Sequence, residues 1–305
     1  MDSFTFIADM QQVFSFADGL LRWLSLHAYS KHYLLLAAVI YWSGFHRLAL
    51  SLSCGILLST MFFLLIKPLI AAPRPFMLDT GLFQGVKESG YGMPSGHSQN
   101  ATVFWGLLAW NVRNPLITAV ALLFIVTISL SRVYLGVHFP SQVLVGITIG
   151  CLVAILCAYF ARQLSTILAT IPRKMLFPIS ISVAVIAPII ILVSGLVIGS
   201  DTHAPKHTYL VLLIGVAIGL IINHSSEDTT KTLKICTMQV LVRTILGLVT
   251  TILIWQLTAT TPTLIKSTIS IYSYSFLRGL IITLWCTILW PRLHQRLCLP
   301  GNIPA

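Results

Sequence analysis

Long apolar stretches separated by short polar segments are the feature that most constrains this chain. Of its 305 residues, 56% are hydrophobic and only 9% are charged, and the mean hydropathy is +0.90. A helix needs ~20 mostly apolar residues to cross a bilayer, whereas soluble domains carry about 25% charged residues. The sequence therefore predicts an all-α, polytopic membrane protein.

The apolar stretches divide the chain into a core and an extension. Segment 4–26 is interrupted by charged and amide side chains, so it is either a spanning helix, which we favour, or an amphipathic helix in the interface. With it, six helices are expected in the core: 4–26, 30–45, 48–70, 96–112, 115–131 and 140–161. About four further spans are expected beyond it: 178–198, 208–223, 235–257 and 268–290. We therefore expect a core over 1–161, a cytosolic basic linker over 162–177 and a transmembrane extension over 178–305.

The last two spans share one spacing. Arg243 precedes Trp255 by the same interval as Arg278 precedes Trp290. This is weak evidence for a repeat. The arginines are either functional charges within the membrane or side chains that extend to its surface.

The charges of the loops predict the orientation. Nine Lys and Arg residues belong to one side: Arg47, Arg113, Arg162, Arg173, Lys174, Lys231, Lys234, Arg292 and Arg296. Four belong to the other side, leaving out the polar clusters described next: Lys31, Lys87, Lys206 and Lys266. Because cytosolic loops are rich in Lys and Arg, the first side is predicted to be cytosolic. The polar clusters then all lie at the opposite, non-cytosolic face.

The first polar cluster follows the span at 48–70. Lys67 and Arg74 lie beside Pro68, Pro73 and Pro75. Prolines interrupt helices, so we expect an irregular segment to present both cations. The alternative is a pair of cations that only reach lipid head groups.

The second cluster, residues 91–97, reads Tyr-Gly-Met-Pro-Ser-Gly-His. Ser95 is a plausible helix N-cap, and Gly96 permits close approach of a ligand to the backbone. Backbone N–H groups at this helix start could hold phosphate oxygens. An ordinary cap with an incidental His97 is the alternative.

The third cluster, residues 131–142, reads Ser-Arg-Val-Tyr-Leu-Gly-Val-His-Phe-Pro-Ser-Gln. Because proline is tolerated in a first helical turn, Pro140 predicts a helix that begins near residue 139, with His138 at its N-terminus. The helix dipole there attracts an anion and keeps an imidazole neutral. A polar loop that caps two membrane helices is the alternative.

Together the clusters provide three cations, two helix N-termini and two histidines. Phosphoryl transfer needs charge stabilisation at the phosphoryl oxygens, with the nucleophile and the leaving group in line. A neutral histidine can form a phosphohistidine, while a protonated one can donate to the leaving oxygen and later activate water. The sequence contains no carboxylate cluster, HExxH motif or Cys set for a metal, so we expect neither a metal nor another cofactor.

The three motifs resemble the signature of the type 2 phosphatidic acid phosphatase superfamily, which is Lys-x6-Arg-Pro, Pro-Ser-Gly-His and Ser-Arg-x5-His-x3-Asp. The matching residues are Lys67, Arg74, Pro75, Pro94, Ser95, Gly96, His97, Ser131, Arg132 and His138. The resemblance implies that His138 is the nucleophile and His97 the general acid. It also implies a phosphate-binding set of Lys67, Arg74, Ser95, Gly96 and Arg132.

One residue departs from this signature, because Gln142 stands where the family has Asp. An Asp would orient His138 and stabilise its imidazolium. Gln can still accept a hydrogen bond from the ring, unless its amide is turned the wrong way round. Glucose-6-phosphatase is similar in having Gln here, so Gln142 is compatible with activity and adds sugar phosphates as candidate substrates.

We therefore expect a metal-independent hydrolase of a membrane lipid phosphate or diphosphate, with the bilayer and the lipid as partners. A phosphatase for a soluble sugar phosphate and a non-catalytic carrier of a phosphorylated lipid stay open as alternatives, as does a phosphotransferase that passes phosphate to a lipid instead of water. No basic block for nucleic acid is visible, and the oligomeric state is open. Compact loops favour a bacterial inner membrane, with the site facing the periplasm. Four polar residues elsewhere on the predicted site face are expected to be solvated loop residues, and the alternative is that one supplies the missing carboxylate or touches a head group: Glu88, Asp201, His203 and His207.

Overall fold

The computed structural model consists of helices and connecting loops over the residues that it describes, which are 3–83, 85, 88, 90–170, 237–258 and 268–297. Four segments are long and apolar enough to cross a membrane: His46–Leu78, Pro115–Tyr134, Pro140–Phe160 and Tyr274–His294. The all-helical membrane protein is thus confirmed, while the total of about ten spans stays a prediction. The spans expected at 178–198 and 208–223 lie outside the described residues, as do Asp201, His203 and His207.

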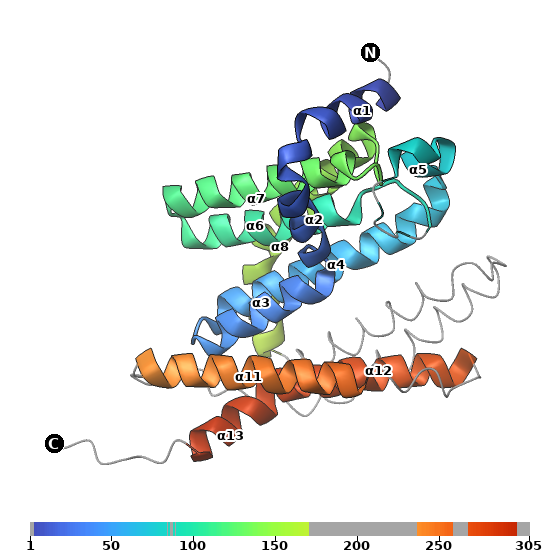
Figure 1. The fold of residues 1–305 in the computed structure, drawn as a ribbon. Coiled ribbons are helices and arrows are strands. Elements are labelled where there is room, and N and C mark those ends of the chain that lie inside the picture. Colours follow the sequence, from blue (N-terminus) through green and yellow to red (C-terminus); the bar gives the residue numbers. More distant parts are fainter. Residues whose placement is uncertain are drawn as a thin grey trace. The chain divides into compact units, whose positions relative to one another are not determined.

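The chain divides into two compact units, which are described separately below. The first unit comprises Met1–Ala37 and Leu50–Ser165, and the second comprises Ala38–Ala49 and Thr166–Ala305. Figure 1 draws the helices between Ser3 and Thr170, which contain nearly all of the first unit, in blue to yellow-green, and the C-terminal helices in orange and red.

The N-terminal segment differs from the single spanning helix that we favoured over 4–26. It forms two short helices, α1 (Ser3–Val13) and α2 (Asp18–His27), joined through the 3-10 turn η1 (Ser15–Ala17). Each is about half as long as a membrane-crossing helix needs to be. Asp18 begins α2, and its carboxylate pairs with Arg22 at 2.8 Å. Both α1 and α2 pack against α7 (Pro115–Tyr134).

Helix α3 (Ser30–Trp42) is followed by the long helix α4 (His46–Ile70). The expectation that an irregular segment presents both cations is wrong for Lys67, because α4 continues through Pro68 to Ile70 and Lys67 lies in its last turn. A proline removes one helical hydrogen bond, and α4 ends two residues after it. The loop beyond contains two short elements, α5 (Pro75–Leu78) and the 3-10 turn η2 (Thr80–Leu82). Arg74 does lie in the extended segment before α5.

Helices α6 (Gly96–Val112) and α7 form an antiparallel hairpin (Figure 1). Asn114 caps α7, since its side-chain oxygen accepts from the backbone N–H of Leu116 at 2.9 Å. Helix α8 (Pro140–Thr170) begins where expected, with Pro140 as its first residue, and continues into the predicted linker. The hairpin places the start of α6 and the end of α7 at the same end of the first unit, where α8 begins.

The second unit contains α11 (Thr237–Leu257), α12 (Thr268–Leu284), the π-helical turn η5 (Trp285–Leu289) and α13 (Trp290–Leu297). The equal spacing noted above results from antiparallel packing. The Arg278 guanidinium lies 4.2 Å from the centre of the Trp255 ring, and the Trp290 indole N–H donates to the Arg243 carbonyl at 3.1 Å. Each arginine position thus lies beside the tryptophan of the other segment, through the side chain of Arg278 and the backbone of Arg243, so the spacing needs no internal repeat.

The π-helical turn has a local cause in Pro291. Because proline has no N–H, carbonyls one turn before it lack a helical partner. Tyr41 donates its hydroxyl to the Thr287 carbonyl at 3.4 Å, and Trp42 donates its indole N–H to the Cys286 carbonyl at 2.7 Å. The end of α3 therefore belongs to the second unit and satisfies these two carbonyls.

Candidate active site

The polar clusters of the sequence meet where four helix ends come together in the first unit. These are the C-terminal ends of α4 and α7 and the N-terminal ends of α6 and α8. Backbone hydrogen bonds tie the intervening loops together: Ser95 N–H donates to the Gln142 carbonyl at 3.1 Å, and Gly92 N–H donates to the Ala72 carbonyl at 2.7 Å. Residues far apart in the sequence are thus fixed around one point.

The turn between α7 and α8 is held by its own backbone. The Arg132 carbonyl accepts from the N–H groups of Val137 (3.3 Å) and His138 (3.2 Å). Gly136 adopts φ +66°, and a Cβ added there would lie 2.0 Å from the Leu82 carbonyl oxygen. Only glycine combines this left-handed conformation with such a close approach. The turn directs the side chain of His138 into the protein, where it is 1% exposed.

Gln142 orients the imidazole of His138. Its side-chain oxygen accepts from Nδ1 of His138 at 3.2 Å and from the Phe139 N–H at 3.2 Å, while its amide nitrogen donates to the Pro73 carbonyl at 2.7 Å. Because the amide nitrogen has an acceptor of its own, the oxygen faces the ring. Nδ1 then carries the proton, and Nε2 of His138 keeps its lone pair.

Gln142 also caps the start of α8, because its side-chain oxygen accepts from the Phe139 N–H. Phe139 occupies the N-cap of α8, and Gln142 is the third residue of the helix. A Gln at this position commonly accepts from the N-cap backbone N–H, as half of a capping box. A Cβ added at Gly92 would lie 2.4 Å from the Gln142 side-chain oxygen, so Gly92 leaves the space that this amide needs.

Arg74 lies against the free side of the His138 ring. Its Nη1 donates to Nε2 of His138 at 3.0 Å and to the Val137 carbonyl at 2.9 Å, and its Nε donates to the Gly90 carbonyl at 2.7 Å. The guanidinium is almost completely buried. Two backbone carbonyls thus hold a cation beside the atom of His138 that is able to attack.

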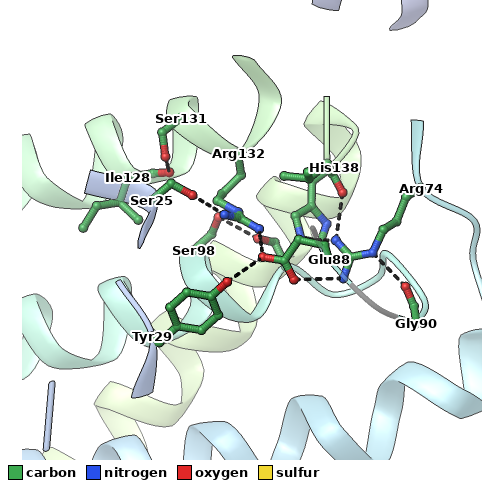
Figure 2. Close-up of polar contacts among 12 residues, drawn as sticks. Ser25, Tyr29, Arg74, Glu88, Gly90, Ser98, Ile128, Ser131, Arg132 and His138 are labelled. Carbon is green, nitrogen blue, oxygen red and sulfur yellow. Dashed lines mark hydrogen bonds and ion pairs between the residues drawn. The ribbon is translucent and has the colours of Figure 1, made fainter. Parts of the chain in front are cut away.

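Arg132 reaches the same point from the last turn of α7. The side chain is fully buried, and its guanidinium donates to the hydroxyl of Ser25 and to the carboxylate of Glu88. Its Nε is buried without a hydrogen-bond partner. Figure 2 shows the carboxylate of Glu88 between the guanidinium groups of Arg132 and Arg74.

His97 comes from the first turn of α6. Its Nε2 is buried without a hydrogen-bond partner, and its ring meets the ring of Tyr29 edge-on with centroids 4.4 Å apart. Ser95 is the N-cap residue of α6, as expected, but its hydroxyl lies 3.0 Å from that of Ser98 and caps no backbone N–H. A Cβ added at Gly96 would lie 3.1 Å from the Phe63 ring, so this helix start is closely packed.

The electrostatics of the site favour a bound anion. Burial lowers the pKa of His138, and the charges of Arg74, Lys67 and Arg132 lower it further, so the ring is neutral at ordinary pH. Burial opposes the ionisation of Glu88, but the nearby cations, mainly Arg132, outweigh it and lower its pKa to about 2. Glu88 is therefore the anion that the site holds in this structure.

The structure brings together every residue expected in the site, and three more that the sequence did not assign to it. Glu88 was expected to be a solvated loop residue, whereas it is ion-paired inside the site. Ser25 comes from α2, Tyr29 comes from the short turn between α2 and α3, and neither carries a motif. Among the described residues, no group of three His, Cys, Asp or Glu side chains is placed to hold a metal ion.

Two family matches agree with this geometry. Residues 48–166 match the PAP2 superfamily, and residues 207–302 match the PAP2 superfamily phosphatase, transmembrane extension. The first match contains all three motifs of the site. The chain belongs to the PAP2 superfamily. As a PAP2 member with the transmembrane extension, it is an integral membrane protein.

Curated relatives of this PAP2 protein come from three organisms. It is similar to phosphatidylglycerophosphatase B of Bacillus subtilis, with 33% identity over 26% of this chain and 43% of the relative. It is also similar to lipid phosphate phosphatase delta of Arabidopsis thaliana, with 29% identity over 38% of this chain and 31% of the relative. For dolichyldiphosphatase of Saccharomyces cerevisiae the identity is 34%, over 32% of this chain and 45% of the relative. The match thus spans less than half of each relative, and no solved structure matches the chain.

Proposed function

We propose that this protein is a membrane phosphatase that releases phosphate from a lipid phosphate or diphosphate through a phosphohistidine on His138. The observation that carries the proposal is the state of the His138 ring. Gln142 holds its Nδ1 as a donor, so Nε2 keeps a lone pair that points toward Arg74. Phosphoryl transfer needs a nucleophile that is oriented by a neighbouring hydrogen-bond acceptor, here Gln142, and a set of cations around the phosphoryl group.

The reaction then has two steps. Nε2 of His138 attacks phosphorus, the bond from phosphorus to the lipid oxygen breaks, and His97 donates a proton to that oxygen. Burial and the charge of Arg132 lower the pKa of His97, and the negative charge of the bound phosphate opposes this by favouring the imidazolium form. In the second step His97 removes a proton from water, the water oxygen attacks the phosphohistidine, and the phosphorus–nitrogen bond breaks. Arg74 and Arg132, with Lys67, neutralise the charge of the phosphoryl oxygens. When phosphate binds, Arg74 donates to it instead of to Nε2 of His138.

A lipid is the substrate class that the comparisons support. All three curated relatives bear the names of lipid phosphatases. The site lies at the ends of α4, α7 and α8, which are candidate membrane spans, so a head group can reach it while the acyl chains stay in the bilayer. Counting of charged loops supports a non-cytosolic position for the site, and compact loops support a bacterial inner membrane.

Gln142 left two other functions open. The hydrogen bond from His138 to Gln142 supports catalysis over a non-catalytic carrier, because the nucleophile is oriented without the Asp of the family signature. A sugar phosphatase and a lipid phosphatase would use the same site residues, so only an assay of both kinds of substrate can distinguish them.

The test is a phosphate-release screen on detergent-purified protein, with EDTA present. The substrates are phosphatidic acid, a polyprenyl diphosphate and glucose 6-phosphate, and each is assayed with the wild type and with His138→Ala. We expect the wild type to release phosphate from a lipid substrate and His138→Ala to release none. Release from glucose 6-phosphate only would refute the lipid proposal, and loss of activity in EDTA would refute the metal-independent mechanism.

A further inference from the structure

Glu88 is paired with the two arginines that the proposed mechanism assigns to the phosphoryl group. Its Oε1 accepts from Nη2 of Arg132 and from the Tyr29 hydroxyl, the latter at 3.3 Å, and its Oε2 lies 3.8 Å from Nη2 of Arg74. Figure 2 shows this carboxylate bridging the two guanidiniums. These guanidinium donors are the ones that would bind phosphoryl oxygens, because arginine recognises carboxylate and phosphate with the same fork of N–H groups.

A carboxylate and a phosphoryl group cannot share these donors. Both are anions, and in a buried site two like charges at hydrogen-bonding distance of the same cations repel each other strongly. Nearby cations lower the pKa of Glu88 to about 2, so the carboxylate is ionised at neutral pH. A substrate must therefore displace Glu88 from Arg132 and Arg74 before His138 can attack.

The displacement favours ligands of higher charge. A tethered group competes at a high effective concentration, in the millimolar range for short flexible links. A phosphate monoester carries a charge of about −1.5 to −2 at pH 7, so it gains more from the cations than the single charge of Glu88 does. A phosphodiester head group carries only one negative charge and gains no such advantage.

We propose that Glu88 is an intramolecular competitor for the phosphate site, which admits phosphomonoester and diphosphate groups and excludes the singly charged phosphodiester head groups of bulk membrane lipids. This inference rests on the proposed phosphatase site. It gives Glu88 the role of a specificity-determining residue, and it explains how a site built to bind phosphate stays open in a membrane made of phosphodiesters.

The test compares Glu88→Gln with wild type in detergent micelles. Calorimetric titration with inorganic phosphate is expected to show binding about tenfold tighter in the variant, because the competing charge is gone. Phosphatidylglycerol, a singly charged diester, is expected to inhibit hydrolysis of phosphatidic acid by Glu88→Gln and not by wild type. Asp79→Asn is the matched control, since Asp79 is an exposed carboxylate of the same loop that caps the Gly81 N–H. Its phosphate affinity should equal that of the wild type.

A second variant guards against loss of folding in the first. Tyr29→Phe removes the hydroxyl that donates to Glu88 and keeps the ring that contacts His97, so it should shift phosphate binding in the same direction by a smaller factor. If either folded variant binds phosphate no more tightly than wild type, Glu88 is a structural partner of Arg132 and the inference is wrong. Tighter phosphate binding in a protein that hydrolyses none of the substrates would refute the proposed function and leave this inference standing.

Discussion

His138 is the residue on which the proposed chemistry depends. His138→Ala removes the attacking nitrogen, so the rate of phosphate release should fall by about 10⁴-fold or more. His46→Gln is the matched control, because His46 belongs to the second unit and packs on Tyr41. The measurement is single-turnover phosphate release, together with mass spectrometry of base-quenched protein for a phosphorylated His138 peptide. A phosphorylated peptide elsewhere in the chain would contradict the assignment.

The side chain at position 142 contacts the His138 ring and affects its ionisation. The attacking form is neutral, so kcat/KM falls as the pH drops through the pKa of His138, which burial and neighbouring cations lower. Gln142→Glu places a carboxylate beside Nδ1, and an opposite charge favours imidazolium. The pKa of His138 then rises, and the acid limb of the pH profile should move to higher pH. An acid limb that stays in place or moves to lower pH would show that His138 does not determine it.

The hydrogen bond that the Gln142 side-chain oxygen accepts from His138 is tested by removing that oxygen. Gln142→Leu removes the oxygen that holds the Nδ1–H tautomer, so kcat should fall by about 10²- to 10⁴-fold, with a smaller change in KM. The upper limit equals the loss of about 10⁴-fold that follows when the His-orienting Asp of a serine protease is replaced by Asn. Steady-state kinetics with phosphatidic acid measure the effect. An unchanged kcat would mean that the ring is oriented by Arg74 alone.

At the scale of elements, the turn from α7 to α8 depends on Gly136. Gly136→Ala adds a methyl group against the Leu82 carbonyl and forces a left-handed backbone on alanine, which costs about 1–3 kcal/mol. We expect a lower unfolding temperature and a lower kcat, because His138 follows this turn by two residues. Gly106→Ala is the control within α6, where an added Cβ meets only the Ala154 methyl at 3.9 Å. It should be neutral or stabilising, and equal effects of both variants would contradict the argument.

At the scale of the whole molecule, the site end of the first unit is predicted to face away from the cytosol. Thr80 lies in the loop at that end, and Arg113 lies between α6 and α7 at the opposite end; both are exposed. In intact spheroplasts, a membrane-impermeant maleimide should label Thr80→Cys and not Arg113→Cys. Both should react once detergent is added. The reverse pattern would overturn the predicted orientation and place the substrate in the cytosolic leaflet.

Much of the site could be predicted because its signal is local in the sequence. The expected site residues belong to three short motifs at the ends of apolar segments: Lys67, Arg74, Ser95, His97, Arg132 and His138. Such ends fall at a membrane face, and alternating spans put every second end on the same side. Pro140 similarly predicted a helix start near residue 139, and α8 begins at Pro140.

Other features depended on contacts that local sequence does not contain. Helix α4 continues through Pro68 although proline predicted a break, and segment 4–26 divides at Asp18 into two short helices packed on α7. Ser25 and Tyr29 reach the site only through that packing. The direction of the Gln142 amide was also open, because it depends on the carbonyl of Pro73, which is far away along the chain.

The sequence by itself determined the membrane class, the family and the residues that we propose to bind phosphate, since apolar length and motif spacing are properties of the chain alone. Only the tertiary structure decided which carboxylate pairs with the two arginines among those residues. Glu88 has no motif, and its charge alone would leave it in solvent. Buried arginines on two other elements bring it into the site, because a buried cation requires an anion close by.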